Sequence, residues 1–352
     1  MQPALTQAEI AALLAVAQDH AFAQPPGSQL RATVLGQHLA AAAGLDPTER
    51  ATAWWTSALR FLGCTGHAFD MAVVFGDEIE MRAESMQADF ANPFDMMRLM
   101  VSHAGPGTTG VQRLRSVLSV LAGGKKAAEL NFRSACEVAD VFAKRLDLDE
   151  AVRASLAASF ERWNGRGLPS GRKGHEIPVP MRIAQLSQEL EVLARIEGID
   201  RALTIIRRRR AKAYDPDLTD LAFAHGPDWW AEVEPADPWD AALGAAPPCP
   251  PLSDEQAIES LLVLADFSDL KSPWLGGHSR AVAELARAAC GPVAEAASLV
   301  HDLGRVAVPN TVWDKPGALT RDERDRAELH AVITDQLLRR LPYTAPLAAI
   351  AC

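Results

Sequence analysis

The amino-acid sequence predicts an all-α protein, and three observations support that prediction. Apolar residues recur every three or four positions in residues 8–18, 29–44, 152–160 and 278–290, which is the spacing of one face of a helix. Alternation of apolar and polar residues, which is typical of half-buried strands, is scarce. Ala and Leu, which favour helices, dominate the composition, whereas Tyr occurs twice among 352 residues.

The expected helices fall into two groups along the chain. Residues 1–233 contain the first three periodic segments, and residues 256–352 contain the fourth. In the second group Thr320 and Glu323 form a capping box, because their side chains can each accept a hydrogen bond from a backbone N–H at a helix start. Residues 234–255 are rich in Pro and Ala and lack periodicity, so we expect a linker there.

The overall composition excludes several classes of function. A net charge of −10 argues against general nucleic-acid binding, and we interpret the basic run at residues 205–214 as a solvated helix end. The five cysteines lack CxxC spacing, which is typical of a reducing compartment. No apolar run reaches about 18 residues and no secretion signal opens the chain, so we expect a cytoplasmic protein without membrane association.

Four residues of the second group could bind metal. His278 opens a periodic segment, the adjacent His301 and Asp302 follow another, and His330 lies about three turns beyond Thr320. Side chains from several helices can converge on a metal inside a bundle. Imidazole nitrogens with a carboxylate suit divalent Fe, Mn or Zn, and a carboxylate can bridge two ions. The alternative is three unrelated histidines, each hydrogen-bonded near a helix end.

A longer pattern around these residues favours the metal site. The segment "HDLGRVAVPNTVWDKPGALTRDERDRAELH" (residues 301–330) resembles the HD-GYP branch of the HD metal-dependent phosphohydrolases, as does "SDLKSPWLGGHSRAVAELA" (residues 268–286). The resemblance implies that His278, His301, Asp302 and His330 are metal ligands. It also implies that Arg305 lies near the substrate phosphate and that Lys315 contacts a phosphate of a cyclic dinucleotide. An ordinary turn lysine remains an alternative for Lys315.

The sequence departs from the family pattern after His330. The family continues with a His-His-Glu segment, a Gly-Tyr-Pro loop and a later Asp ligand, whereas this sequence stops at "LAAIAC" (residues 347–352). From residues 256–352 alone we therefore expect an incomplete two- or three-metal site. The sequence would then be either a truncated reading frame or a cut piece of a longer chain.

A degenerate counterpart of the missing segment occurs upstream, at residues 159–193. There Ser159 and Phe160 replace the two histidines, Leu168 replaces the Tyr, and residues 186–187 (Leu-Ser) stand where the later Asp is expected. Four other residues of the family pattern persist: Glu161, Gly165, Gly167 and Pro169.

Further upstream, other family positions also carry residues that do not bind metal. Arg60 and Phe61 in "SALRFLGCTG" replace His-Asp, Cys136 is expected in place of His330, and Gln29 is expected in place of His278. The resemblance therefore predicts two HD-domain-like helical bundles in tandem, of which the first has lost its chemistry. The remaining candidates for a separate site have no spacing that suggests a mechanism: His67, His103, His175 and Glu80.

Two functions follow from this pattern. The first is a metal-dependent phosphohydrolase acting on phosphodiesters or other phosphate esters, with a cyclic dinucleotide as the substrate that the resemblance implies and with small esters as promiscuous substrates. In it Asp302, Arg305 and Lys315 act in catalysis, because cations near a metal-bound phosphate stabilise developing negative charge. The second is a weak or inactive regulatory or scaffold protein that binds a partner or a nucleotide. A second copy of the chain is a further expected partner.

Overall fold

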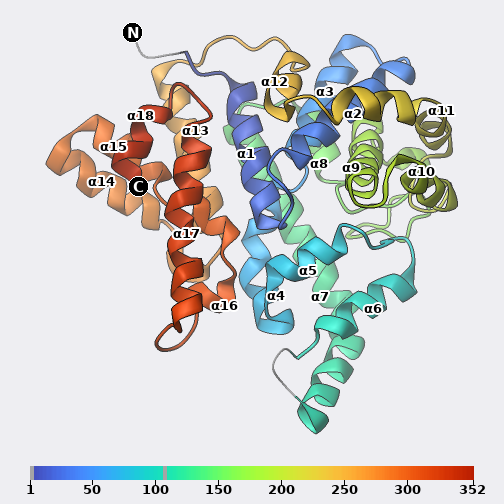
Figure 1. Ribbon diagram of the computed structural model, residues 1–352, viewed down its shortest axis with the longest axis horizontal. Coiled ribbons are helices and arrows are strands. Elements are labelled where there is room, and N and C mark those ends of the chain that lie inside the picture. Colours follow the sequence, from blue (N-terminus) through green and yellow to red (C-terminus); the bar gives the residue numbers. More distant parts are fainter. Residues whose placement is uncertain (1–3, 106–108) are drawn as a thin grey trace.

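The computed structural model describes residues 4–105 and 109–352, and it is built from helices (Figure 1). Apart from helices, the described residues form two isolated β-bridges, Thr6 with Pro251 and Arg210 with Tyr214. The predicted all-α class is therefore confirmed. In the described part of the chain, no helix is both long enough and apolar enough to cross a membrane.

The helices form a first segment (residues 4–233), an intervening helix, and a second segment (residues 254–351). The first segment has α1 (Gln7–Ala21), α2 (Ser28–Ala42), α3 (Pro47–Ala58), η1 (Leu62–His67), α4 (Ala68–Phe75), α5 (Glu78–Ser85), α6 (Pro93–His103), α7 (Gly110–Arg145), α8 (Glu150–Leu156), η2 (Gly174–Glu176), α9 (Val179–Glu197), α10 (Ile199–Arg208) and α11 (Pro216–Val233). Next comes α12 (Pro238–Gly244). The second segment has α13 (Asp254–Asp269), η3 (Pro273–Leu275), α14 (His278–Cys290), α15 (Pro292–Val300), η4 (Leu303–Ala307), α16 (Asn310–Trp313), α17 (Arg321–Leu338) and α18 (Ala345–Ala351).

The predicted linker contains a helix, so part of that expectation was wrong. Asp237 caps α12 by accepting hydrogen bonds from the backbone N–H groups of residues 239 and 240, and Pro238 supplies a φ suited to the first helical turn. Ala242 is fully buried, and its carbonyl accepts a hydrogen bond of 3.0 Å from Trp54 Nε1. This helix is too short to show a periodic pattern, and its packing on α2 compensates for its length.

One local arrangement occurs in both segments, at the start of α2 and of α14. Asp19 accepts hydrogen bonds from the backbone N–H groups of Gly27 (2.8 Å) and Gln29 (2.9 Å). Asp269 likewise accepts from the backbone N–H (2.9 Å) and hydroxyl (2.7 Å) of Ser279, ten residues further on. Each helix is preceded by a glycine with positive φ, at residues 27 and 277. The first residue of α2, Ser28, therefore matches the first residue of α14, His278.

A second arrangement is shared by the 3-10 helices η1 and η4. A Cβ on Gly63 would lie 1.8 Å from the carbonyl oxygen of Ala135 on α7. A Cβ on Gly304 would lie 2.1 Å from the carbonyl oxygen of His330 on α17. Since only a glycine allows such close approach of two backbones, each pair fixes the register between its 3-10 helix and its long helix.

These two arrangements correct two of the expected correspondences. Gln29 was expected in place of His278, but the helix start puts Ser28 there. Cys136 was expected in place of His330, but the glycine contact puts Ala135 there. Both differences are shifts of one residue, which the sequence could not reveal because the register is determined by contacts between backbones in the folded chain. The corrected residues are also poor metal ligands.

The two segments are packed against each other around α1 and α13 (Figure 1). Helix α1 of the first segment is buried along most of its length and contacts both η1 and η4. Helix α13 of the second segment contacts the same two 3-10 helices. At the same boundary Lys271 Nζ donates a 2.7 Å hydrogen bond to Glu78 Oε1, and both side chains are almost fully buried. The backbone N–H of Asn310 donates to the same carboxylate.

Breaking this buried ion pair should destabilise the protein strongly. Lys271→Met leaves the Glu78 carboxylate buried without its cation, and loss of one partner of such a pair costs about 3–5 kcal/mol. Urea unfolding followed by circular dichroism measures the effect. Arg133→Met, which breaks the exposed Arg133–Glu129 pair, is the control and should change the free energy of unfolding by less than about 1 kcal/mol.

The double variant Lys271→Met with Glu78→Gln tests the charge explanation, because Gln can still accept from Asn310 N–H. It should regain most of the lost stability. A double variant as unstable as Lys271→Met alone would show that shape, and not charge, determines the contact.

Candidate metal centre

The four predicted ligands come from three helix boundaries and one helix interior. His278 is the first residue of α14, His301 ends α15, Asp302 immediately precedes η4, and His330 lies within α17. The contact of Gly304 with the backbone of α17 brings the His-Asp turn against His330. The hydrogen bonds from Ser279 to Asp269 fix the start of α14, and with it His278.

The structure brings the three histidines together around the carboxylate of Asp302. The Nε2 atoms of His278 and His301 lie 3.4 Å and 3.3 Å from Asp302 Oδ2. The Nε2 atom of His330 lies 3.7 Å from the other oxygen, Oδ1. Among the described residues, His278, His301 and Asp302 form the one group whose ligand atoms all lie within 4.8 Å of one another. Asp302 thus presents both of its carboxylate oxygens to histidine nitrogens.

Hydrogen bonds to backbone carbonyls orient two of the imidazoles. His301 Nδ1 lies 2.7 Å from Ser298 O, and His330 Nδ1 lies 2.6 Å from Ala327 O. Because a carbonyl oxygen only accepts, Nδ1 of each ring carries a proton and donates it to the carbonyl, which leaves Nε2 facing Asp302. A carbonyl behind the ring is the usual partner of a metal-binding histidine.

Asp302 has the features of a cation ligand. Its side chain is 5% exposed, and its Oδ2 atom is buried without a hydrogen-bond partner. Burial alone raises the pKa of this carboxyl, but contact with His301 and the charges of Arg305 and His330 outweigh it and hold the pKa below its usual value. The Asp302 carboxylate in turn raises the pKa of His301 against the effect of burial. A buried carboxylate oxygen without a hydrogen bond, beside three imidazoles, fits a divalent cation.

Arg305 and Trp313 form one wall of the centre. Arg305 Nη1 lies 3.1 Å from Asp302 Oδ2, and the guanidinium lies 4.4 Å from the centre of the Trp313 ring. The same indole meets the His330 ring edge-on at 5.3 Å. Sequence reasoning identified Arg305 but missed Trp313, because a single Trp between two motifs has no diagnostic spacing. It also missed the positioning residue Asp269.

Lys315 lies in the turn before α17 and binds a neighbouring carboxylate. Its Nζ donates to both oxygens of Glu323, at 2.8 Å and 2.6 Å. This pair, with the cap hydrogen bond from Thr320, lowers the pKa of Glu323 to about 2. The Lys-Pro-Gly turn is thereby tied to the first turn of α17.

In the part of the chain that the structure describes, the candidates His67, His103 and His175 are not members of a group that could hold a metal ion. His67 is buried, which lowers its pKa to about 3, so its ring is neutral at physiological pH. His103 pairs with Glu84 at 3.0 Å, and the ring of His175 lies edge-on to Trp163. Glu80 is exposed.

The all-α fold and the convergence of three histidines on one aspartate are the arrangement that the resemblance to HD phosphohydrolases implied. No family model matches the sequence. A curated relative, 3'3'-cGAMP-specific phosphodiesterase 3 of Vibrio cholerae serotype O1 (strain ATCC 39315 / El Tor Inaba N16961), is 26% identical over 359 aligned positions, which cover 97% of this chain and 77% of that protein.

A solved structure is also similar to this chain. It is the crystal structure of a cyclic GMP-AMP specific phosphodiesterase of V. cholerae (V-cGAP3), with a TM-score of 0.69 and 25% identity, and the match covers 96% of this chain and 80% of that one. The two similarities support the assignment to the HD-GYP branch that the sequence motifs predicted, and they favour an enzyme over a scaffold.

A Cβ at residue 304 should disrupt the centre. Gly304→Ala places a methyl group 2.1 Å from His330 O and 2.8 Å from Thr334 N, so η4 must move away from α17 and Asp302 from His330. We expect lower metal content, measured by elemental analysis of the purified protein, and a loss of about 1–3 kcal/mol in stability.

The matched control is Gly276→Ala, where a Cβ would meet nothing within 4 Å and φ is −54°. This control should keep the metal content of the wild type. A Gly304→Ala protein with full metal content would show that the close contact does not define the site.

Proposed function

We propose that this chain is a metal-dependent phosphodiesterase of the HD-GYP type that hydrolyses a cyclic dinucleotide. The single observation that carries the proposal is the convergence of three imidazole Nε2 atoms on the Asp302 carboxylate, at 3.3–3.7 Å. The names of both similar proteins describe phosphodiesterases of cyclic GMP-AMP, which supports a cyclic dinucleotide as the substrate class. The metal ion is divalent Fe, Mn or Zn, which this set of donors suits.

The chain's residues prepare the site for a charged substrate. A divalent cation held there supplies Lewis-acid chemistry, because it acidifies a water molecule and polarises a phosphoryl oxygen. The carbonyls behind His301 and His330 keep both Nε2 lone pairs directed inward, so no side-chain rotation is needed when the site is loaded. The side chains of the three histidines are 24–36% exposed, so a phosphodiester can reach them from solvent.

Two cations are placed to balance the charge of the phosphodiester. Arg305 is positioned by the ion pair of its Nη1 with Asp302 and by the face of Trp313, and its Nε atom is buried without a hydrogen-bond partner. In this proposal the Nε–H group donates to a phosphate oxygen, where it stabilises charge that develops in the transition state. Lys315 is the outer cation, and it exchanges Glu323 for a substrate phosphate.

We also propose that the two segments are copies of one module. The Asp–Gly helix start and the glycine contact occur in both, and they match His278, His301, Asp302 and His330 to residues 28, 60, 61 and 135. Ser, Arg, Phe and Ala at these positions bind divalent cations poorly. Hydrolysis is therefore assigned to the second segment.

Removing ligands should abolish both metal binding and turnover. His301→Ala and Asp302→Ala each remove a donor, so metal content and hydrolysis of 3'3'-cGAMP should fall together, with turnover reduced by about 10²-fold or more. Product formation is followed by chromatography, with bis(p-nitrophenyl) phosphate as a small promiscuous substrate.

His225→Ala is the control, since this exposed histidine of α11 stacks only on Trp229 among its aromatic neighbours. It should retain metal and activity. Full activity in the ligand variants would refute the site, whereas wild type without metal would favour the regulatory or scaffold alternative.

Loss of Lys315 should separate substrate binding from metal binding. Lys315→Met leaves the four ligands in place, so metal content stays unchanged while KM for 3'3'-cGAMP rises about tenfold through loss of one charge-assisted contact. Glu323→Gln weakens the competing partner of Lys315 and should lower KM or leave it unchanged. Equal kinetics in wild type and Lys315→Met would make this lysine an ordinary turn residue.

A further inference from the structure

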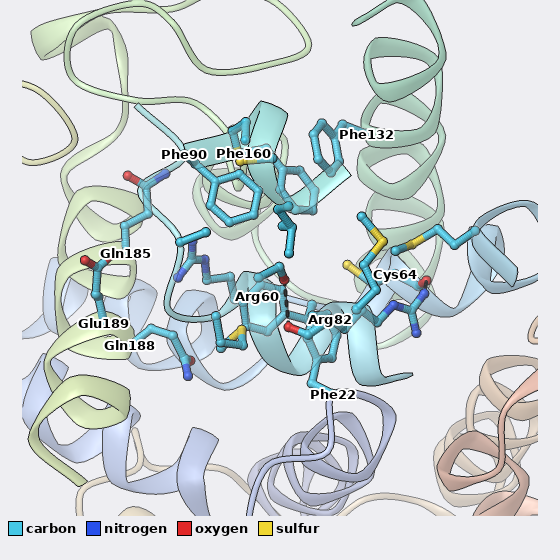
Figure 2. A pocket seen from close by; sticks show the side chains of 18 of the residues that line it. Phe22, Arg60, Cys64, Arg82, Phe90, Phe132, Phe160, Gln185, Gln188 and Glu189 are labelled. Atoms are coloured by element: carbon cyan, nitrogen blue, oxygen red, sulfur yellow. Dashed lines mark hydrogen bonds between the residues drawn. The ribbon is translucent and has the colours of Figure 1, made fainter. Parts of the chain in front are cut away.

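The first segment keeps a cavity at the place that the metal centre occupies in the second. The cavity has a volume of about 110 Å³, and its lining includes Arg60, Phe61 and Cys64. By the register of the two glycine contacts, these residues match His301, Asp302 and Arg305. Figure 2 shows Arg60 beside the phenylalanines of the lining, with Gln185, Gln188 and Glu189 of α9 on the opposite wall.

Two guanidinium groups face this cavity without a full set of partners. Arg60 and Arg162 are each 6% exposed, and the Nε atom of each is buried without a hydrogen bond. Arg60 makes a long 3.4 Å contact to Ser159 O, and Arg162 lies over the Phe90 ring at 5.2 Å. The third lining arginine, Arg82, is instead fixed by hydrogen bonds to Cys64 O (2.6 Å) and Ala21 O (3.4 Å).

The positive charge of the lining exceeds its negative charge. Among the described residues that line the cavity, Glu189 is the one acid, and Arg209 from outside the lining already binds it. Burial and the nearby Arg162 lower the pKa of Arg60 to about 9, so it is still a cation at physiological pH. Burying such charges without a full set of partners is costly, and an anion between them would remove that cost.

Volume limits what the anion can be. An engineered cavity of about 150 Å³ accommodates benzene, and ordinary ligand pockets span about 300–1,000 Å³. At about 110 Å³ the cavity fits a phosphate-sized group and not a whole nucleotide. Several phenylalanine rings also line the cavity, and such an apolar wall strengthens each charge interaction.

We propose that the first segment binds a phosphate group in this cavity, with the Arg60 and Arg162 guanidiniums as its ligands. The group is either free phosphate or the phosphoryl end of a larger molecule. A metal-binding module whose His-Asp pair is replaced by Arg-Phe has thereby become an anion-binding module. The proposal does not depend on the activity of the second segment.

Calorimetric titration of the full chain with inorganic phosphate tests this site. The protein carries Asp302→Asn and is freed of metal with a chelator, so that phosphate cannot bind at the candidate metal centre. We expect saturable binding of one equivalent. Arg60→Met and Arg162→Met should each weaken it about tenfold or more, because each removes charge-assisted hydrogen bonds.

Arg210→Met is the control, since Arg210 pairs with Asp220 at the surface and is not in the cavity lining; binding should be unchanged. Phenyl phosphate in a second titration separates the sources, because tighter binding than phosphate identifies the end of a larger molecule and weaker binding identifies the free ion. Ala88→Leu, which fills the cavity and keeps both arginines, should also block binding. The Ala88→Leu variant therefore tests the proposed site even where an arginine variant fails to fold.

Absence of saturable binding to the protein with Asp302→Asn would overturn the proposal. So would phosphate affinity that is the same with and without the Arg60, Arg162 and Ala88 substitutions. Loss of phosphodiesterase activity in unrelated variants has no bearing on this result, since the titration measures no turnover.

Discussion

The arrangement of the candidate metal centre depends on the missing side chain at Gly304. With its Cα against the backbone of α17, the turn that carries His301 and Asp302 lies directly beside His330. Any other residue would push these elements apart by more than a ligand sphere tolerates, because metal–ligand distances vary by only about 0.2 Å. The same close approach at Gly63 shows that the frame of the site is a packing contact between backbones, independent of the ligands placed on it.

Within that shared frame, the two segments place positive charge by different means. The second segment presents imidazoles and a carboxylate, so its cation has to come from solution. The first segment presents Arg60 at the position of His301, with Phe61 in place of the carboxylate. Arg60 therefore brings a covalently attached cation to the same location, and no metal is needed to balance an anion there. Together with Arg162, this replacement in one turn would reverse the sign of the ligand that the proposed site attracts.

The sequence predicted the all-helical class, which the structure confirms. It also singled out the four residues that the structure brings together, because the His-Asp turn, the Lys-Pro-Gly turn and the distant His330 lie in a fixed order. It did not predict α12, whose stability comes from tertiary contacts such as the Trp54 hydrogen bond to Ala242. It placed Cys136 where the glycine contact puts Ala135, because the register is determined by a contact between two backbones that the sequence does not show. Trp313 and Asp269 act through geometry alone, so only the folded chain reveals them.

The ion pair between Glu78 and Lys271 also constrains the order in which the chain can fold during its synthesis. Its two residues are 193 positions apart. At a synthesis rate of about 5–20 residues per second, α5 is synthesised roughly 10–40 s before Lys271, the cation that pairs with Glu78. During that interval the Glu78 carboxylate has no partner to accompany it out of water, so this face of the first segment stays open. The first segment can complete its packing only after Lys271 of the second segment has been synthesised, so the two segments complete their folding together.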